Sequence, residues 1–162
     1  MNSSDKLVEF LIKKENCKLR QYNDIAGLLT IGIGHLITAE EKKSGTIYNI
    51  SYVNGITVEQ ARYIKKLDLE KMEYFVNKYV NDNISLKQHE FDALVSLCFN
   101  IGPGSLKNST LLRRLNSDHD RNLIANEFLK WNKARVNGVL RPVKGLTIRR
   151  NEERNIFLNA VY

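Results

Sequence analysis

A continuous helical pattern from Thr57 to Val80 constrains the fold more than any other feature of this sequence. The stretch opens with a capping box, Thr57-x-x-Gln60, whose two side chains satisfy backbone N–H groups at a helix start. Apolar residues then recur at helical spacing, namely Ile64, Leu67, Met72, Phe75, Val76 and Tyr79. At about 1.5 Å per residue such a helix is roughly 35 Å long, which is enough to join two lobes.

The residues before this helix predict a small lobe of mixed helix and strand. Ser4 and Asp5 can open a first helix, and residues 17–34 are typical of a β-hairpin with a turn-rich centre. A second capping box, Thr38-x-x-Glu41, predicts a short helix. A weak third strand is expected over residues 46–52.

Helical patterns dominate the residues after Val80. A capping box at Ser85-x-x-Gln88 predicts a helix whose apolar face carries Phe91 and Leu94, and Gly102-Pro103-Gly104 predicts a turn. Short helices are expected over residues 111–115 and 123–131. A loop that contains Gly138, Pro142 and Gly145 precedes the expected last helix.

The chain is therefore predicted to have an α+β fold in three parts. Residues 1–56 form a small N-terminal lobe with a short antiparallel sheet, and residues 57–80 form the linking helix. Residues 81–162 form a larger all-helical C-terminal lobe, on which the first helix can pack. A cleft between two such lobes is a common place for a ligand.

Composition narrows the class of protein but does not choose a partner. The 162 residues are 43% hydrophobic and carry a formal net charge of +7, which attracts polyanions such as nucleic acid, anionic lipid or an acidic cell-wall polymer. No apolar run approaches the roughly 20 residues of a membrane span. Charged residues interrupt the N-terminal segment, so it is a poor signal peptide and we expect synthesis in a cytoplasm. Cys17 and Cys98 fit that compartment as reduced thiols.

Glu15 occupies a position that packing does not explain. Leu7, Val8, Leu11 and Ile12 form one face of the first helix, and Glu15 falls near the centre of that face. Partial burial would raise the pKa of its carboxyl group and suit it to act as a general acid.

Asp24 lies nine residues further on, in a polar turn that keeps a carboxylate ionised, and Thr30 offers a hydroxyl group that could hold a water molecule. An acid paired with an ionised carboxylate is what glycosidic cleavage needs. The plainer interpretation is a helix-end Glu and a turn Asp, and the chemistry alone favours it.

The segment from Thr30 to His35 alternates between two kinds of residue. Ile31 and Ile33 point to one side, and Gly32 and Gly34 share the other side with Thr30. A face of glycines often marks the close approach of a ligand or of another backbone, and here it suits a sugar chain. The competing interpretation is a phosphate-binding loop, but the glycine spacing matches neither common nucleotide-binding pattern.

The sequence resembles phage lysozymes, also called endolysins, over essentially its whole length. Glu15, Asp24 and Thr30 have the spacing of the catalytic triplet in that family. Further similar segments occur in the same order, namely TIGIGHLIT (30–38), GITVEQA (55–61), FDALVS (91–96), FNIG (99–102), NSTLL (108–112), Trp131 and GLTIRRNEE (145–153).

This resemblance implies a lysozyme-like fold and hydrolysis of the β-1,4 bond between N-acetylmuramic acid and N-acetylglucosamine in peptidoglycan. Glu15 would be the general acid. Asp24 would stabilise positive charge at the sugar or activate water, and Thr30 would position that water. Inversion requires the two carboxyl groups to lie about 6.5–9.5 Å apart, and sequence spacing leaves the stereochemistry open.

The resemblance also assigns supporting roles. Leu36, Phe99 and Ser109 match positions that contact the glycan, and Asn100 stands where some relatives carry a longer amide. His35 is expected to form a structural pair with Asp68 on the linking helix. Arg149 matches a basic residue that pairs with the catalytic Glu, although Glu153, one helical turn away, is an alternative partner.

The expected partner is the peptidoglycan glycan strand, bound by a monomer that needs no metal or other cofactor. We expect no binding of nucleic acid and no stable insertion into a membrane. The enzyme would be made in the host cytoplasm and would act on the cell wall, in the periplasm, after a holin releases it. A lytic transglycosylase and a basic helical nucleic-acid-binding protein are the alternative functions.

Overall fold

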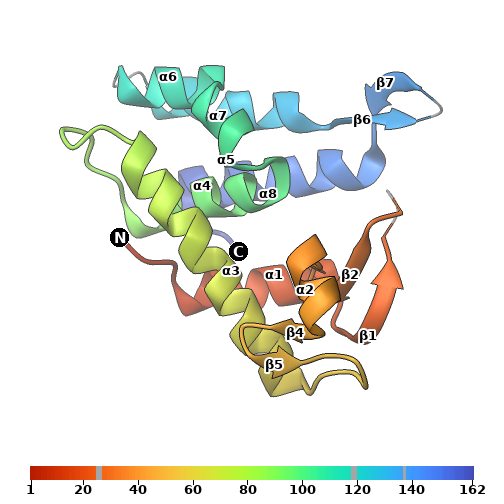
Figure 1. Cartoon of the computed structure of the whole chain (residues 1–162). Helices are drawn as coiled ribbons and strands as arrows, with labels where there is room; N and C mark the ends of the chain where they lie inside the picture. The colour runs from red at the N-terminus through yellow and green to blue at the C-terminus, as the bar shows by residue number, and fades with distance from the viewer. Residues whose placement is uncertain (25–26, 118–119, 137) are drawn as a thin grey trace. The chain divides into compact units, whose positions relative to one another are not determined.

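The computed structural model describes residues 1–24, 27–117, 120–136 and 138–162. The chain divides into two compact units (Figure 1). One unit comprises Val8–Glu70, and the other comprises Met1–Leu7 together with Lys71–Tyr162. The long helix is divided between them, so the three-part division at residues 56 and 80 stays a prediction.

The unit Val8–Glu70 contains a three-stranded antiparallel sheet of order β1-β2-β3 and a separate two-stranded sheet, β4-β5. Its elements are α1 (Asp5–Glu15, which begins in the other unit), β1 (Lys18–Asn23), β2 (Leu29–Gly32), β3 (His35–Leu36), α2 (Ala39–Ser44), β4 (Thr46–Ile47), β5 (Ile50–Ser51) and the first part of α3 (Val58–Tyr79). The expected hairpin around Asp24 is confirmed as β1–β2. The expected third strand over residues 46–52 is instead the β4–β5 pair, and β3 completes the main sheet.

Two predicted capping boxes start helices in this unit. Thr38 accepts a hydrogen bond from the Glu41 amide at 3.3 Å, and Glu41 accepts one from the Thr38 amide at 2.8 Å. Thr57 and Gln60 exchange the equivalent bonds at the start of α3. Behind the sheet lies one apolar cluster, made of Ile31, Ile33, Ile37, Ile47, Tyr52, Ile56, Ala61 and Ile64.

The second unit is built mainly from helices that follow α3. Its elements are α4 (Gln88–Ile101), α5 (Pro103–Lys107), α6 (Thr110–Asn116), α7 (Arg121–Phe128), the 3₁₀ helix η1 (Leu129–Trp131), β6 (Lys133–Val136), β7 (Val139–Pro142) and α8 (Lys144–Asn159). Helix α4 packs along α8, and α7 packs on both α6 and α8 (Figure 1). Phe91, Leu94 and Phe157 are among the side chains buried in this core.

Two details of this unit differ from the sequence prediction. Lys133–Val136 and Val139–Pro142, in the stretch expected as a loop, pair as the antiparallel strands β6 and β7, so the unit is not all-helical. Helix α4 begins after Lys87, whose amide donates to Glu90 at 2.8 Å, and the expected Ser85–Gln88 box does not cap it. Glu90 caps the helix in place of that box, because its carboxylate, at the third helical position, reaches back to the Lys87 amide, which has no partner within the helix.

Candidate active site

The three predicted catalytic residues all lie in the unit Val8–Glu70. Glu15 is the last residue of α1, Asp24 directly follows β1, and Thr30 lies within β2. Helix α1 ends there because Asn16 adopts a left-handed conformation with φ of 53°, which Asn tolerates better than most residues. The chain then enters β1, so the helix end and the sheet hold the three side chains on one small scaffold.

The half-buried side chain of Glu15 lies against Gly34, in the turn between β2 and β3. A Cβ atom at Gly34 would stand 3.1 Å from Glu15 Oε2 and 3.3 Å from its Cδ. The glycine therefore leaves the space that the carboxyl group of Glu15 uses. This explains how the carboxyl group of Glu15 fits beside the apolar face of α1.

Gly32 does not belong to a sugar-binding face of glycines. A Cβ atom at Gly32 would meet Ile56 at 3.3 Å and Ala61 at 3.4 Å, so Gly32 packs against the core. Gly34 faces Glu15. The glycines therefore permit the close approach of other parts of the chain. This was one of the two interpretations of a glycine face, beside the approach of a ligand.

A Gly34→Ala variant is expected to lose at least about tenfold in activity, because the new methyl group would displace the carboxyl group of Glu15 and a misplaced catalytic group can cost about 10²-fold. Gly34 also has φ of 74°, so alanine there adds backbone strain. Gly138→Ala is the matched control, since Gly138 has φ of 79° and no atom near its Cβ position. Activity assays and thermal unfolding should show a similar loss of stability in both variants and a loss of activity only in Gly34→Ala.

Asp24 and Thr30 are linked through Leu28. The backbone amide of Leu28 donates to Asp24 Oδ1 at 2.8 Å, and Thr30 Oγ1 donates to the Leu28 carbonyl oxygen at 3.0 Å. Thr30 is buried, with 3% of its surface exposed. Because its proton is directed to a carbonyl group, Thr30 Oγ1 is left as an acceptor, which can orient a water molecule by one of that water's protons.

His35 lies between two carboxylates. Its Nδ1 is 2.8 Å from Asp68 Oδ2, as predicted, and its Nε2 is 3.2 Å from Glu41 Oε2. Tyr48 also donates to Asp68, at Oδ1 and 2.8 Å. Sequence reasoning missed Glu41 as a partner because its capping role already explained it. These contacts tie α2, β3 and α3 together behind the site.

The contacts within this cluster shift the pKa values of His35 and Glu41. Burial by itself lowers the pKa of His35, but the hydrogen bonds and charges of Asp68 and Glu41 outweigh burial, so its pKa is raised. Burial acts to raise the pKa of Glu41, but the hydrogen bonds from Thr38 and His35 overcome this effect and lower it.

The stability of the protein should therefore have a maximum in mildly acidic solution. The raised pKa of His35 stabilises the fold below the unfolded imidazole pKa of about 6.5, and this contribution disappears as pH rises through the folded value. The lowered pKa of Glu41 stabilises the fold above its unfolded value of about 4.3, and this contribution disappears as pH falls. Urea unfolding at pH 5.5 and 8.5 should show greater stability at the lower pH. His35→Asn should reduce that difference, and an unchanged difference would rule out the cluster as its source.

The predicted glycan-contacting residues occupy different environments. Leu36, at the end of β3, is 51% exposed, which suits a contact with substrate. Phe99 is partly buried on α4, and Asn100 beside it is exposed. Ser109 is buried and caps α6 by accepting a hydrogen bond from the Leu112 amide at 3.0 Å. Ser109 therefore has a structural role whether or not it meets substrate.

Arg149 contacts the alternative partner that the sequence suggested. Its Nε lies 3.2 Å from Glu153 Oε1 on the same helix, α8. Glu153 is fully buried and also meets Arg150 Nε at 2.8 Å and the Ser96 hydroxyl at 2.7 Å. Burial raises the pKa of Glu153, while the charges of Arg150 and Arg149 oppose this rise. The sequence analysis did not single out Arg150, although its i,i+3 spacing to Glu153 could have revealed the pair.

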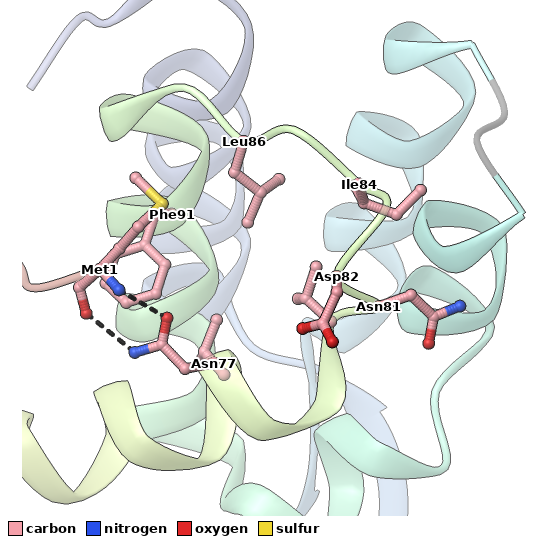
Figure 2. A pocket seen from close by; sticks show the side chains of 9 residues that line it. Met1, Asn77, Asn81, Asp82, Ile84, Leu86 and Phe91 are labelled. Atoms are coloured by element: carbon pink, nitrogen blue, oxygen red, sulfur yellow. Dashed lines mark hydrogen bonds between the residues drawn. The ribbon is translucent and has the colours of Figure 1, made fainter.

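A pocket of about 190 Å³ opens elsewhere, in the helical unit, and apolar side chains such as Phe91 form much of its lining (Figure 2). At its edge the Met1 amine donates to Asn77 Oδ1, and Asn77 Nδ2 donates to the Met1 carbonyl oxygen, each at 2.8 Å. These polar groups bind each other, and the pocket has a single carboxylate, Asp82. It therefore lacks the acid and ionised carboxylate that glycosidic cleavage needs.

Two further observations concern the part of the chain that the structure describes. There, no group of three His, Cys, Asp or Glu side chains is arranged to hold a metal ion. No helix in the same residues has both the length and the apolar character that a bilayer span requires.

Comparison with known proteins identifies the family. The phage lysozyme family model matches residues 12–153, a range that contains Glu15, Asp24 and Thr30. The chain belongs to the phage lysozyme family. Among its relatives, an endolysin of Acyrthosiphon pisum secondary endosymbiont phage 1 is 34% identical over 99% of this chain and 100% of that protein.

Solved structures of similar proteins agree with this assignment. An endolysin from Escherichia coli O157:H7 phage FAHEc1 superposes with a TM-score of 0.86 at 34% identity, covering 100% of this chain and 96% of that one. The muramidase domain of SpmX from Asticaccaulis excentricus superposes with a TM-score of 0.79 at 29% identity, covering 96% of this chain and 97% of that one. The predicted lysozyme-like α+β fold is confirmed. This phage lysozyme is a glycoside hydrolase whose substrate is peptidoglycan.

Proposed function

We propose that this phage lysozyme hydrolyses the β-1,4 bond between N-acetylmuramic acid and N-acetylglucosamine, with Glu15 as general acid, Asp24 as second carboxylate and Thr30 as holder of the water. The observation that carries this proposal is the arrangement around the sheet. Glu15 is half-buried against Gly34, while Asp24 and Thr30 are fixed through the same residue, Leu28.

The two carboxyl groups have different surroundings, which supports different roles. Glu15 lies at the end of a packed helix, where it can give its proton to the leaving glycosidic oxygen. Asp24 lies in a turn and accepts a hydrogen bond from the Leu28 amide. An ionised Asp24 can stabilise positive charge at the sugar or activate the water that Thr30 orients.

The other predicted residues support this reaction. Leu36, Phe99 and Ser109 contact the glycan, Asn100 adjusts those contacts, and Arg149 pairs with Glu15 as well as with Glu153. The His35–Asp68 pair holds β3 against α3 and so steadies the turn that contains Gly34. The exposed side chain of Leu36 and the partly buried ring of Phe99 are compatible with a sugar ligand.

The substrate indicates where in the host cell the enzyme acts. The enzyme is made in the host cytoplasm, acts as a monomer and reaches the cell wall in the periplasm after a holin opens the membrane. It forms no lasting complex with nucleic acid, inserts stably into no membrane and lyses the host cell by cutting its wall. The net charge of +7 favours retention on an acidic wall polymer.

A digest of purified peptidoglycan tests the proposed reaction. Product masses should show one water added for each bond cut, with reducing N-acetylmuramic acid at the new ends. Anhydro sugars would instead identify a lytic transglycosylase. Unaltered peptidoglycan, together with DNA binding that weakens steeply with salt, would identify a nucleic-acid-binding protein. Assignment of the anomer in the first products would decide between inversion and retention.

A further inference from the structure

Tyr22 stands in line with two of the proposed site residues. On β1 it is the Cα partner of Thr30 on β2, and Thr30 is the Cα partner of Leu36 on β3. Directly opposite residues of antiparallel strands share one face of a sheet. Tyr22, Thr30 and Leu36 therefore form one row across the sheet, with the proposed water-holding residue in the middle.

The ring of Tyr22 is held in place by a cation. Lys18 Nζ lies 4.0 Å from the centroid of the ring, four residues earlier on the same strand. A cation over an aromatic face is attractive, and the attraction grows where water is partly excluded. The half-buried ring thus has a defined orientation before substrate arrives.

The hydroxyl group of Tyr22 lies in the field of both proposed catalytic carboxyl groups. Burial raises the pKa of Tyr22, and the negative charges of Glu15 and Asp24 raise it further. The phenol is therefore harder to deprotonate than that of a free tyrosine. A protonated phenol beside two carboxyl groups can donate its O–H to a group placed near them.

We propose that Tyr22 is a further substrate-positioning residue, whose hydroxyl group donates a hydrogen bond to the sugar that Glu15 and Asp24 act upon. This inference rests on the proposed function. In it, Lys18 holds the ring, Tyr22 holds the sugar at one end of the row, and Leu36 contacts the glycan at the other end. Thr30 then presents the water between two fixed contacts.

Tyr22→Phe tests the hydroxyl group, because it keeps the ring and its contact with Lys18. We expect kcat/KM on soluble peptidoglycan strands to fall by roughly 5- to 20-fold, the effect of losing one hydrogen bond in a partly buried site. The thermal midpoint should stay unchanged. Tyr63→Phe is the matched control, since Tyr63 is 53% exposed on α3 in the same unit, and this variant should keep full activity.

The split between KM and kcat separates this role from a structural one. A hydroxyl group that holds the sugar acts on substrate binding, so Tyr22→Phe should raise KM more than it lowers kcat. A second variant, Lys18→Met, should lower kcat/KM less, because it loosens the ring without removing the hydroxyl group. A Tyr22→Phe enzyme with wild-type kcat/KM, or with a loss confined to kcat, would overturn the inference.

Failure of this inference can be told apart from failure of the proposed function. If Glu15→Gln is inactive and Tyr22→Phe is fully active, the proposed reaction stands and the role of Tyr22 falls. If Glu15→Gln cuts peptidoglycan normally, the assignment of Glu15 as general acid itself is wrong.

Discussion

Glu15→Gln is expected to lose about 10²- to 10⁴-fold in peptidoglycan cleavage, which is the usual contribution of a general acid. The amide has the size and shape of the carboxyl group, so it still fits against Gly34, where a Cβ atom would stand only 3.1 Å from Oε2. It cannot give up a proton to a leaving oxygen. The rate of release of soluble fragments from labelled peptidoglycan measures the loss.

Glu9→Gln provides the control for this experiment. Glu9 lies on the same helix, α1, and pairs with Arg62 at 2.6 Å on the surface. Exposed ion pairs contribute little to stability, so this variant should keep both its fold and its activity. Circular dichroism and thermal midpoints should agree for all three proteins. A Glu15→Gln enzyme with more than a tenth of wild-type activity would remove Glu15 from the role of general acid.

Local patterns in the sequence predicted the parts of the site that depend on neighbours along the chain. The apolar face of α1 singled out Glu15, turn chemistry placed Asp24 after β1, and two capping boxes located the starts of α2 and α3. Each of these features is decided within a few residues, by helical periodicity, turn preference or the satisfaction of backbone N–H groups.

Contacts between distant segments were the part that sequence patterns could not supply. Gly32 and Gly34 were correctly marked as places of close approach, but the sequence did not show that Ala61 approaches Gly32 and Glu15 approaches Gly34. Tyr22 lies opposite Thr30 only because of the register between β1 and β2. A shift of that register by one residue would place the two side chains on opposite faces of the sheet. The β6–β7 hairpin was also missed, because its two strands are only four residues long and almost fully exposed, so no buried face marks them in the sequence.

The largest effect on stability is expected from Glu153. Its carboxylate is fully buried and accepts hydrogen bonds from Ser96, Arg149 and Arg150, and Arg150 is fully buried as well. Removing one partner of a buried ion pair leaves the other charge in a place where water cannot solvate it, which costs about 3–5 kcal/mol. Glu153→Gln should therefore lower the thermal midpoint by roughly 6–20 °C in a protein of this size.

A double variant shows whether the penalty comes from the uncompensated charge. Arg150→Met with Glu153→Met replaces both buried charges by apolar side chains, and it should recover most of the stability lost in Glu153→Gln. Glu70→Gln, on the exposed side of α3, should leave the midpoint unchanged. Equal losses in the single and double variants would show that packing, not charge, governs this position. The result also bears on catalysis, because Glu153 pairs with Arg149, the residue proposed to pair with Glu15.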